Sequence, residues 1–108
     1  MRVVLTVESG LKRGHKIWLR GRQSLSVGAT EWADLALPDD PLLSHVHFTL
    51  HSQNRLCRIC DQESEHGTFV NGQPIVDQRL ADGDSLQAGR TLFSVTIEVP
   101  HTTLHRAA

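Results

Sequence analysis

The sequence consists of short apolar runs separated by turn-forming residues, and the sharpest of these turns is Asn71-Gly72. Asn and Gly tolerate the positive φ angles of a tight turn, so this pair predicts a hairpin between residues 69–70 and 74–75. The runs recur at intervals of about 8–12 residues, and the 3.6-residue period of a helix is sustained nowhere. This pattern predicts an all-β sandwich or barrel without a substantial helix.

Alternation of apolar and polar residues locates the strands, because successive strand residues point to opposite faces. In residues 46–51, Phe48 and Leu50 are predicted on one face and three polar side chains on the other, namely His47, Thr49 and His51. Asp82-Gly83-Asp84 predicts a second hairpin, which leads into residues 85–88. Further predicted strands cover residues 2–7, 15–19, 24–27, 35–37, 56–61 and 90–99.

Length and charge argue against several classes of protein. The 108 residues suffice for one domain with its own core, which we expect over residues 1–100, with residues 101–108 as a tail or the start of a linker. A formal net charge of −1 gives no support to a nucleic-acid or membrane partner. No apolar run approaches the roughly 18 residues of a membrane span, and the N-terminus lacks the layout of a signal peptide. We therefore expect a cytoplasmic domain.

The two cysteines, Cys57 and Cys60, have the C-x-x-C spacing of half a zinc site or of a redox dithiol. They fall in a predicted strand, where residues three apart point to opposite faces, so their sulfur atoms are not expected to converge on one metal ion. We therefore interpret them as small apolar residues of a strand and expect no cofactor.

Several turn motifs follow one another at specific spacings. They are Gly28, residues 34–38, Ser44-x-x-His47, Asp61, Ser64-x-x-Gly67-Thr68-x-Val70-Asn71-Gly72 and Leu80-x-Asp82-Gly83-Asp84. Each motif alone is weak, but their combination is specific. From about Val3 to Val99, it resembles the pattern of a forkhead-associated (FHA) domain. The resemblance implies a sandwich of two packed sheets whose loops at one end recognise phosphothreonine in a partner.

The resemblance also implies roles for individual positions. A phosphate of charge near −2 needs a cation and several neutral donors. The family supplies an Arg directly after the glycine that matches Gly28, a hydroxyl at Ser44, often an Arg or Asn after that serine, and an Asn before the Gly-Thr pair. The resemblance implies a framework role, which for His47 is a buttress within the loops, for Gly28, His47, Gly67, Thr68, Asn71 and Gly72.

This sequence departs from the family at most of the positions that face the phosphate. Ala29 replaces the Arg, His45 follows the serine, and Glu65 and His66 precede the Gly-Thr pair. A charge-assisted bond from Arg to phosphate is worth about 1.5–3 kcal/mol, or roughly 10- to 100-fold in affinity. We therefore expect a non-catalytic protein–protein interaction module in signalling or assembly, with phosphothreonine recognition weakened or lost.

The alternative is a working reader of phosphothreonine peptides in which His45 and His66 join Ser44 as phosphate contacts. A neighbouring phosphate favours the charged form of an imidazole, whose ordinary pKa is about 6.5, so binding by this route strengthens as the pH falls. Three arginines elsewhere are further candidates for the missing cation, namely Arg22, Arg55 and Arg58. The opposing interpretation is that both histidines only bond to backbone carbonyls.

An enzyme and a metal site are two further alternatives. Ser44, with His45, His47 and Asp61, supplies the residue types of a hydrolase triad, but the G-x-S-x-G turn is missing from the sequence. The candidate metal ligands are His45, His47, His66 and Glu65, if strand pairing begins as early as residue 45. We expect neither function, because both need a geometry that the spacing does not favour.

The expected partner is another protein or a protein segment, which is threonine-phosphorylated under the alternative interpretation. Trp18 and Trp32 are predicted to pack on the sandwich or its loops, and an exposed Trp that anchors a partner is the alternative. Domains of this kind are often parts of longer signalling, secretion or gene-regulatory proteins, so the chain is a candidate for one domain of a larger protein.

Overall fold

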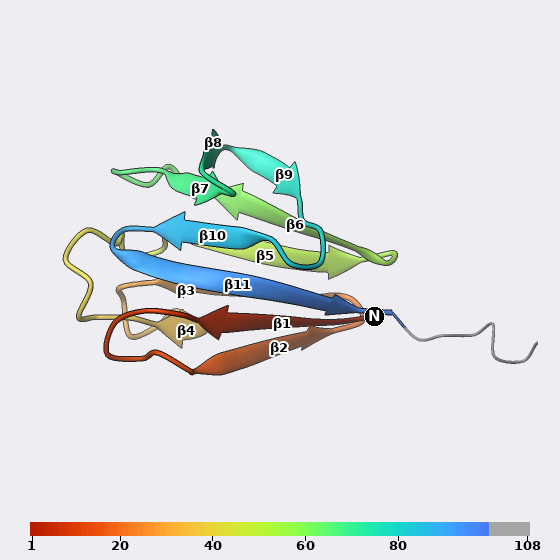
Figure 1. The fold of residues 1–108 in the computed structure, drawn as a ribbon. Helices are drawn as coiled ribbons and strands as arrows, with labels where there is room; N and C mark the ends of the chain where they lie inside the picture. The colour runs from red at the N-terminus through yellow and green to blue at the C-terminus, as the bar shows by residue number, and fades with distance from the viewer. Residues whose placement is uncertain (100–108) are drawn as a thin grey trace, which may run out of the picture.

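Two β-sheets face each other in the computed structural model, which describes residues 1–99 (Figure 1). The larger sheet has the order β2 (Lys16–Arg20), β1 (Arg2–Val7), β11 (Thr91–Glu98), β10 (Ser85–Ala88), β7 (Thr68–Val70) and β8 (Gln73–Ile75). The smaller sheet has the order β4 (Leu35–Ala36), β3 (Gln23–Gly28), β5 (Phe48–Gln53), β6 (Leu56–Asp61) and β9 (Asp77–Arg79). The predicted all-β sandwich of two packed sheets is confirmed. The predicted tail, residues 101–108, lies outside the described residues.

The core lies between the two sheets and is built by the predicted alternation. Val3, Leu5 and Val7 of β1 are all fully buried. Phe48 of β5 and Phe93 of β11 meet edge to face, with ring centroids 5.5 Å apart, and so connect the two sheets. Over residues 1–99, the structure contains no helix that could cross a membrane.

The Asn71-Gly72 hairpin forms as predicted. The two residues have φ angles of 50° and 84°, and Val70 pairs with Gln73 across the turn. The Asn71 side chain accepts a 2.9 Å hydrogen bond from the backbone N–H of Ser85 and donates one of 2.9 Å to Asp84. Its side chain therefore fastens the hairpin to the start of β10.

The prediction of a second hairpin at Asp82-Gly83-Asp84 is wrong. The chain does turn there, since the N–H of Asp84 bonds to the carbonyl of Ala81 at 3.1 Å and Gly83 has a φ of 89°. However, β9 before the turn pairs with β6 in the smaller sheet, whereas β10 after it pairs with β7 and β11 in the larger one. Turn residues specify a local reversal, and the choice of partner strand depends on distant residues. The segment is a crossover between sheets.

Neither Trp is packed in the way that the sequence predicted. Trp32, between β3 and β4, is 86% exposed, and Trp18 on β2 is 49% exposed. By contrast, the cysteines lie as predicted: Cys57 is buried in the core, where burial raises the pKa of its thiol to about 11, and Cys60 lies on the partly exposed outer face of β6.

Five connections gather at one end of the sandwich, which we call the loop end (on the left in Figure 1). They are residues 8–15, 29–34, 37–47, 62–67 and 89–90. The turns at residues 21–22, 54–55 and 80–84 lie at the opposite end (Figure 1). Residues far apart in the sequence therefore meet at the loop end, which is where the candidate site lies.

Candidate functional site

His47 is the central framework residue of the loop end. It is fully buried and precedes β5, so the predicted outward-facing alternation does not extend to it. Its Nδ1 accepts a 3.1 Å bond from the N–H of Ser44, which leaves Nε2 to donate to the carbonyl of Gly67 at 2.8 Å. Its backbone N–H bonds to Val27 of β3 at 2.8 Å. One side chain thus fixes the relative positions of two loops.

Asp61, the last residue of β6, fixes the loop of residues 62–67 through hydrogen bonds. Its carboxylate accepts hydrogen bonds from the hydroxyls of Ser64 (2.5 Å) and Thr68 (2.6 Å) and from the N–H of Ser64 (3.1 Å). The Ser64 hydroxyl in turn accepts a 3.0 Å bond from the N–H of Gly67. Partial burial works to raise the pKa of Asp61, but the bonds from Ser64 and Thr68 and the nearby His47 hold it below its ordinary value. The carboxylate is therefore committed to shaping this loop.

Gly28 is required because another loop rests directly on it. A Cβ atom at this position would lie 1.9 Å from the carbonyl oxygen of His45 and 2.8 Å from the Cα atom of Val46. The N–H of Ala29 donates to Ser44 at 3.0 Å, and that of Thr30 donates to His45 at 3.1 Å. The backbone of residues 28–30 is thereby joined to the segment that carries Ser44.

The residues predicted to face a phosphate lie at the tips of the same loops. The Ser44 hydroxyl accepts a 3.0 Å bond from the N–H of Glu65, which joins the two loops, and its own proton is still available for donation. His45 and His66 are exposed, and Glu65 Oε1 lies 3.8 Å from His66 Nε2 with its side chain 82% exposed. Ala29 is partly buried and packs against the core. The tips therefore present two imidazoles and a carboxylate.

No Lys or Arg contributes to these loops. The sequence has none between Arg22 and Arg55, nor in residues 62–67. The loops of residues 29–34, 37–47 and 62–67 carry six carboxylates, namely Glu31, Asp34, Asp39, Asp40, Glu63 and Glu65. Around an incoming phosphate, this charge is unfavourable.

The three arginines considered as substitute cations do not reach the site. Arg22 and Arg55 lie in turns at the opposite end of the sandwich. Arg58 points out from β6, where its guanidinium pairs with Asp77 at 2.7 Å. These positions depend on strand direction, which the sequence pattern alone did not give.

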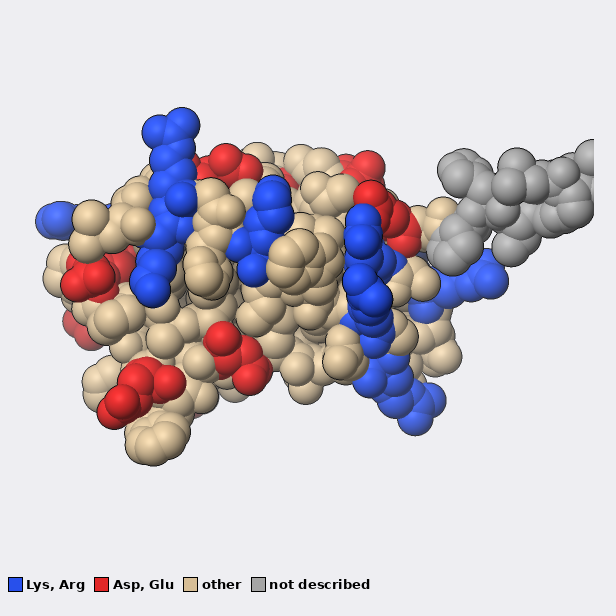
Figure 2. Space-filling view, turned by 90° about the horizontal axis from the view of Figure 1, so that it is seen from below, with Lys and Arg blue, Asp and Glu red and all other residues tan. Residues whose placement is uncertain are grey.

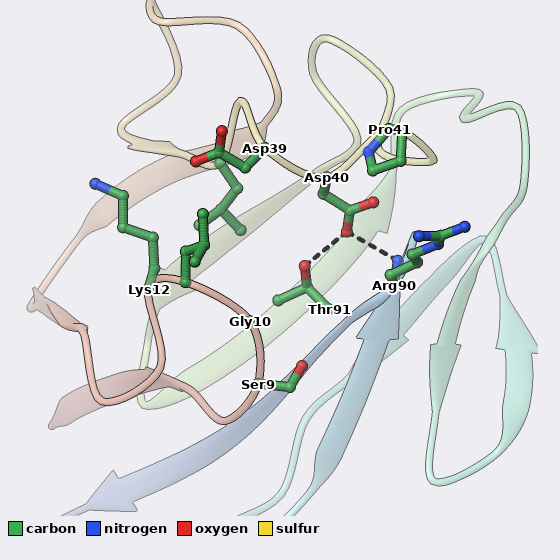
Figure 3. A pocket seen from close by; sticks show the side chains of 10 residues that line it. Ser9, Gly10, Lys12, Asp39, Asp40, Pro41, Arg90 and Thr91 are labelled. Carbon is green, nitrogen blue, oxygen red and sulfur yellow. Dashed lines mark hydrogen bonds between the residues drawn. The ribbon is translucent and has the colours of Figure 1, made fainter.

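The structure instead brings Arg90 to the loop end, in the turn between β10 and β11 (Figure 3). Asp40, which is buried, accepts bonds from the N–H of Arg90 (2.8 Å), the Thr91 hydroxyl (2.6 Å) and the N–H of Leu42 (3.0 Å). Burial works to raise the pKa of Asp40, but these bonds and the Arg90 charge hold it below its ordinary value. Gly89 has a φ of 59°, and a Cβ atom there would lie 2.7 Å from a carboxylate oxygen of Asp40, so a larger residue would strain the turn and displace that side chain. The sequence analysis missed this turn, which Gly89, between two apolar runs, could have indicated.

A cleft of about 190 Å³ adjoins the hydrogen-bonded group around Asp40 and lies between the loop after β1 and the loop after β4. Its walls include Leu11, Leu37 and Pro41. Figure 3 shows Lys12 and Arg90 on opposite sides of it, with Asp40 bonded to Thr91 between them. The two cations diverge, so they do not form one anion site.

The geometry also bears on the enzyme and metal alternatives. Both ring nitrogens of His47 are occupied by backbone groups, and the Ser44 hydroxyl is bonded to Glu65 N–H instead of to an imidazole. The strand pairing that would align His45 with His47 begins only at Phe48. Among residues 1–99, no group of three His, Cys, Asp or Glu side chains is arranged to hold a metal ion.

Comparison with known proteins identifies the family. A family model described as the inner membrane component of T3SS, cytoplasmic domain, matches residues 6–98. The glycogen accumulation regulator GarA of Mycobacterium tuberculosis is 31% identical over 87 residues, which are 81% of this chain and 52% of GarA. The chain thus spans about half the length of this relative.

Solved FHA domains share the fold over nearly the whole chain. One, from a structural and functional analysis of phosphothreonine-dependent FHA domain interactions, has a TM-score of 0.84 and 28% identity and covers 93% of this chain and 100% of that one. The FhaA FHA domain, complexed with the intracellular domain of Rv3910, has a TM-score of 0.77 and 30% identity and covers 86% of this chain and 98% of that one. The chain therefore belongs to the family that the matching model describes and is an FHA domain, a non-catalytic binding module.

Proposed function

We propose that this domain is a protein–protein interaction module of signalling or assembly whose loop end binds a protein segment without relying on phosphothreonine. One observation carries the proposal. The loops of residues 29–34, 37–47 and 62–67 contain six carboxylates and no Lys or Arg, and Ala29 stands beside Ser44 where the family has its Arg. A dianionic phosphate would lose its solvation there without gaining a cation. The loss of the Arg contact alone corresponds to roughly 10- to 100-fold in affinity.

The buried framework supports retention of binding as such. His47, Asp61 and Asp40 hold the loops through hydrogen bonds that need no ligand. A preorganised loop cluster loses little conformational entropy when a partner binds. The match to a family described as a cytoplasmic domain supports a cytoplasmic location, and the partial coverage of GarA supports a role as one domain of a longer protein.

A second candidate function is phosphothreonine recognition through substitute contacts. It is favoured by the Ser44 hydroxyl, which still has a proton to donate, and by the two exposed imidazoles beside it, His45 and His66. The complex of the FhaA FHA domain with the intracellular domain of Rv3910 supports the binding of a protein segment by a similar chain.

A paired titration separates the two candidates. Fluorescent peptide pools with randomised residues around a fixed threonine would be titrated with the full chain, once phosphorylated and once plain, and the anisotropy measured. We expect the phosphorylated pool to bind no more tightly than the plain one. A preference of tenfold or more for the phosphorylated pool, abolished by Ser44→Ala, would establish the second candidate instead.

A further inference from the structure

The charges of this chain are segregated along the sequence. Residues 1–28 hold six of the eleven Lys and Arg residues but only one of the twelve Asp and Glu residues, Glu8. The six cations are Arg2, Lys12, Arg13, Lys16, Arg20 and Arg22. A net charge of −1 therefore conceals a basic N-terminal quarter and an acidic remainder.

The strand β2 displays this basic character on an exposed face. Ile17 and Leu19 point toward the core, so Lys16, Trp18 and Arg20 point away from it, and all three are exposed. We call these three side chains the β2 face. Figure 2 shows Lys and Arg side chains crossing the side of the molecule on which β2 lies, with most Asp and Glu toward its borders.

The cations of the β2 face are not neutralised by the fold. Arg20 lies directly opposite Arg2, and like charges in this position oppose each other. Arg2 is paired with Glu98, whereas within residues 1–99 neither Lys16 nor Arg20 has a carboxylate partner. Among the described residues, the Lys16 ammonium group bonds only to the Thr6 hydroxyl, at 3.2 Å. The fold thus keeps two positive charges available for an outside partner.

Protection of a sheet edge does not explain the whole β2 face. The strand β2 is at the edge of its sheet, and Lys and Arg there discourage edge-to-edge aggregation. Trp18 serves no such purpose, since a half-exposed indole favours association. An indole between two cations is suited to a partner surface that is acidic and also carries apolar area.

The same chain exposes acidic and apolar side chains of this kind on two loops. The loops that follow β3 and β4 expose the carboxylates of Glu31, Asp34 and Asp39, and they also expose Trp32, which is 86% accessible. We call Glu31, Trp32 and Asp39 the acidic tips. They lie on loops at the loop end, whereas the β2 face lies along the side of the sandwich (Figure 1). In a contact between two copies through these surfaces, the loop end of one copy would therefore meet the side of the other.

We propose that the β2 face binds the acidic tips of a second copy of this chain, which rests on the proposed function of the loop end as a protein-binding surface. Lys16 and Arg20 would lie against the carboxylates of Glu31 and Asp39, and Trp18 and Trp32 would supply the apolar centre. Because the two surfaces differ, the contact is heterologous and each copy keeps one face open for the next. Association therefore continues beyond a dimer, into a closed ring or an open chain.

The test is the mass of the full chain in solution, measured by sedimentation velocity from about 10 µM to 1 mM. We expect the weight-average mass to rise beyond that of a dimer near 50 mM salt and to fall back near 500 mM, where charges are screened. Lys16→Glu/Arg20→Glu and Glu31→Lys/Asp39→Lys should each weaken association at least about tenfold. The control Arg55→Glu/Arg79→Glu makes the same change in net charge as the first variant, at the opposite end and on β9, and should leave the mass unchanged.

The decisive experiment is the same mass measurement on a mixture of the two charge-reversed variants. Each variant repels its own kind, but in the mixture both contacts become attractive again, so the mass should return to that of the parent chain. A parent chain that is monomeric at 1 mM would overturn the inference, as would a mixture that fails to associate. Binding to vesicles of anionic lipid without self-association would assign the β2 face to a membrane and overturn it too. The peptide titration, run with dilute chain, tests the proposed function separately.

Discussion

The buried and the exposed parts of the loop end differ from each other in chemistry. Below the surface, His47 and Asp61 make the hydrogen bonds that hold the loops together. At the loop tips, Ala29, His45 and Glu65 occupy positions for which the resemblance to FHA domains implies phosphate contacts. The framework is constrained because a lost bond leaves a buried polar group without a partner, whatever the loops bind. The tips carry no such penalty, so their charge can change while the fold persists.

Removal of the His47 ring should break the framework and produce the largest effect. His47→Ala leaves the N–H of Ser44 and the carbonyl of Gly67 without their partner and opens a cavity at a fully buried site. We expect a loss of about 3–5 kcal/mol in the free energy of unfolding, measured with urea. His66→Ala, at an exposed tip, is the control and should cost less than about 0.5 kcal/mol. Similar losses for the two variants would contradict the division into framework and tips.

Restoring a cation at the tips should reverse the expected ligand preference. Ala29→Arg places a guanidinium beside Ser44, to which the backbone of residue 29 is already bonded at 3.0 Å. We expect affinity for the phosphorylated peptide pool to rise by roughly 10- to 100-fold over the plain pool, as for one Arg–phosphate contact. Ala29→Gln is the uncharged control in the same anisotropy titration. If the arginine variant gains nothing, the acidic loops or the lost scaffold geometry, and not the missing Arg, would be the cause.

Acidification should weaken the framework through the protonation of Asp61. The pKa of Asp61 is below its ordinary value in the folded chain, so its contribution is fully present above the unfolded pKa of about 3.9 and is lost as the pH falls through the folded pKa. Asp61→Asn should cost about 1–3 kcal/mol at neutral pH and should flatten the decline in stability below about pH 4. Urea midpoints measured across pH 2–7 would show this. If the stability of the variant still declines as steeply below about pH 4 as that of the parent chain, other carboxylates, such as Asp40, would account for the decline.

The smallest effect is expected from the two imidazoles at the tips. If they do not read phosphate, His45→Ala/His66→Ala should change the ratio of phosphorylated to plain affinity by less than about twofold at both pH 6 and pH 8. The same peptide pools provide the measurement, with Arg55→Ala at the opposite end as the control. A preference for phosphate that strengthens at pH 6 and disappears in the double variant would favour the second candidate function.

The sequence by itself determined the all-β class, most strand positions, the hairpin at Asn71-Gly72 and the absence of Lys and Arg from residues 23–54. These features follow from local rules, namely the two-residue period of a strand and the φ preferences of turn residues. The identities of Ala29, His45 and Glu65 also needed no structure. Their consequence for the charge of the loops could be stated from the motif order alone.

Only the tertiary structure decided which residues meet. It assigned β9 and β10 to different sheets, although a turn sequence joins them, and it buried His47 where alternation predicted an outward side chain. It sent Arg55 to the opposite end and brought Arg90 to Asp40, fifty residues away in sequence. Pairing between distant strands sets these positions, and a local pattern contains no information on which strand will be the partner.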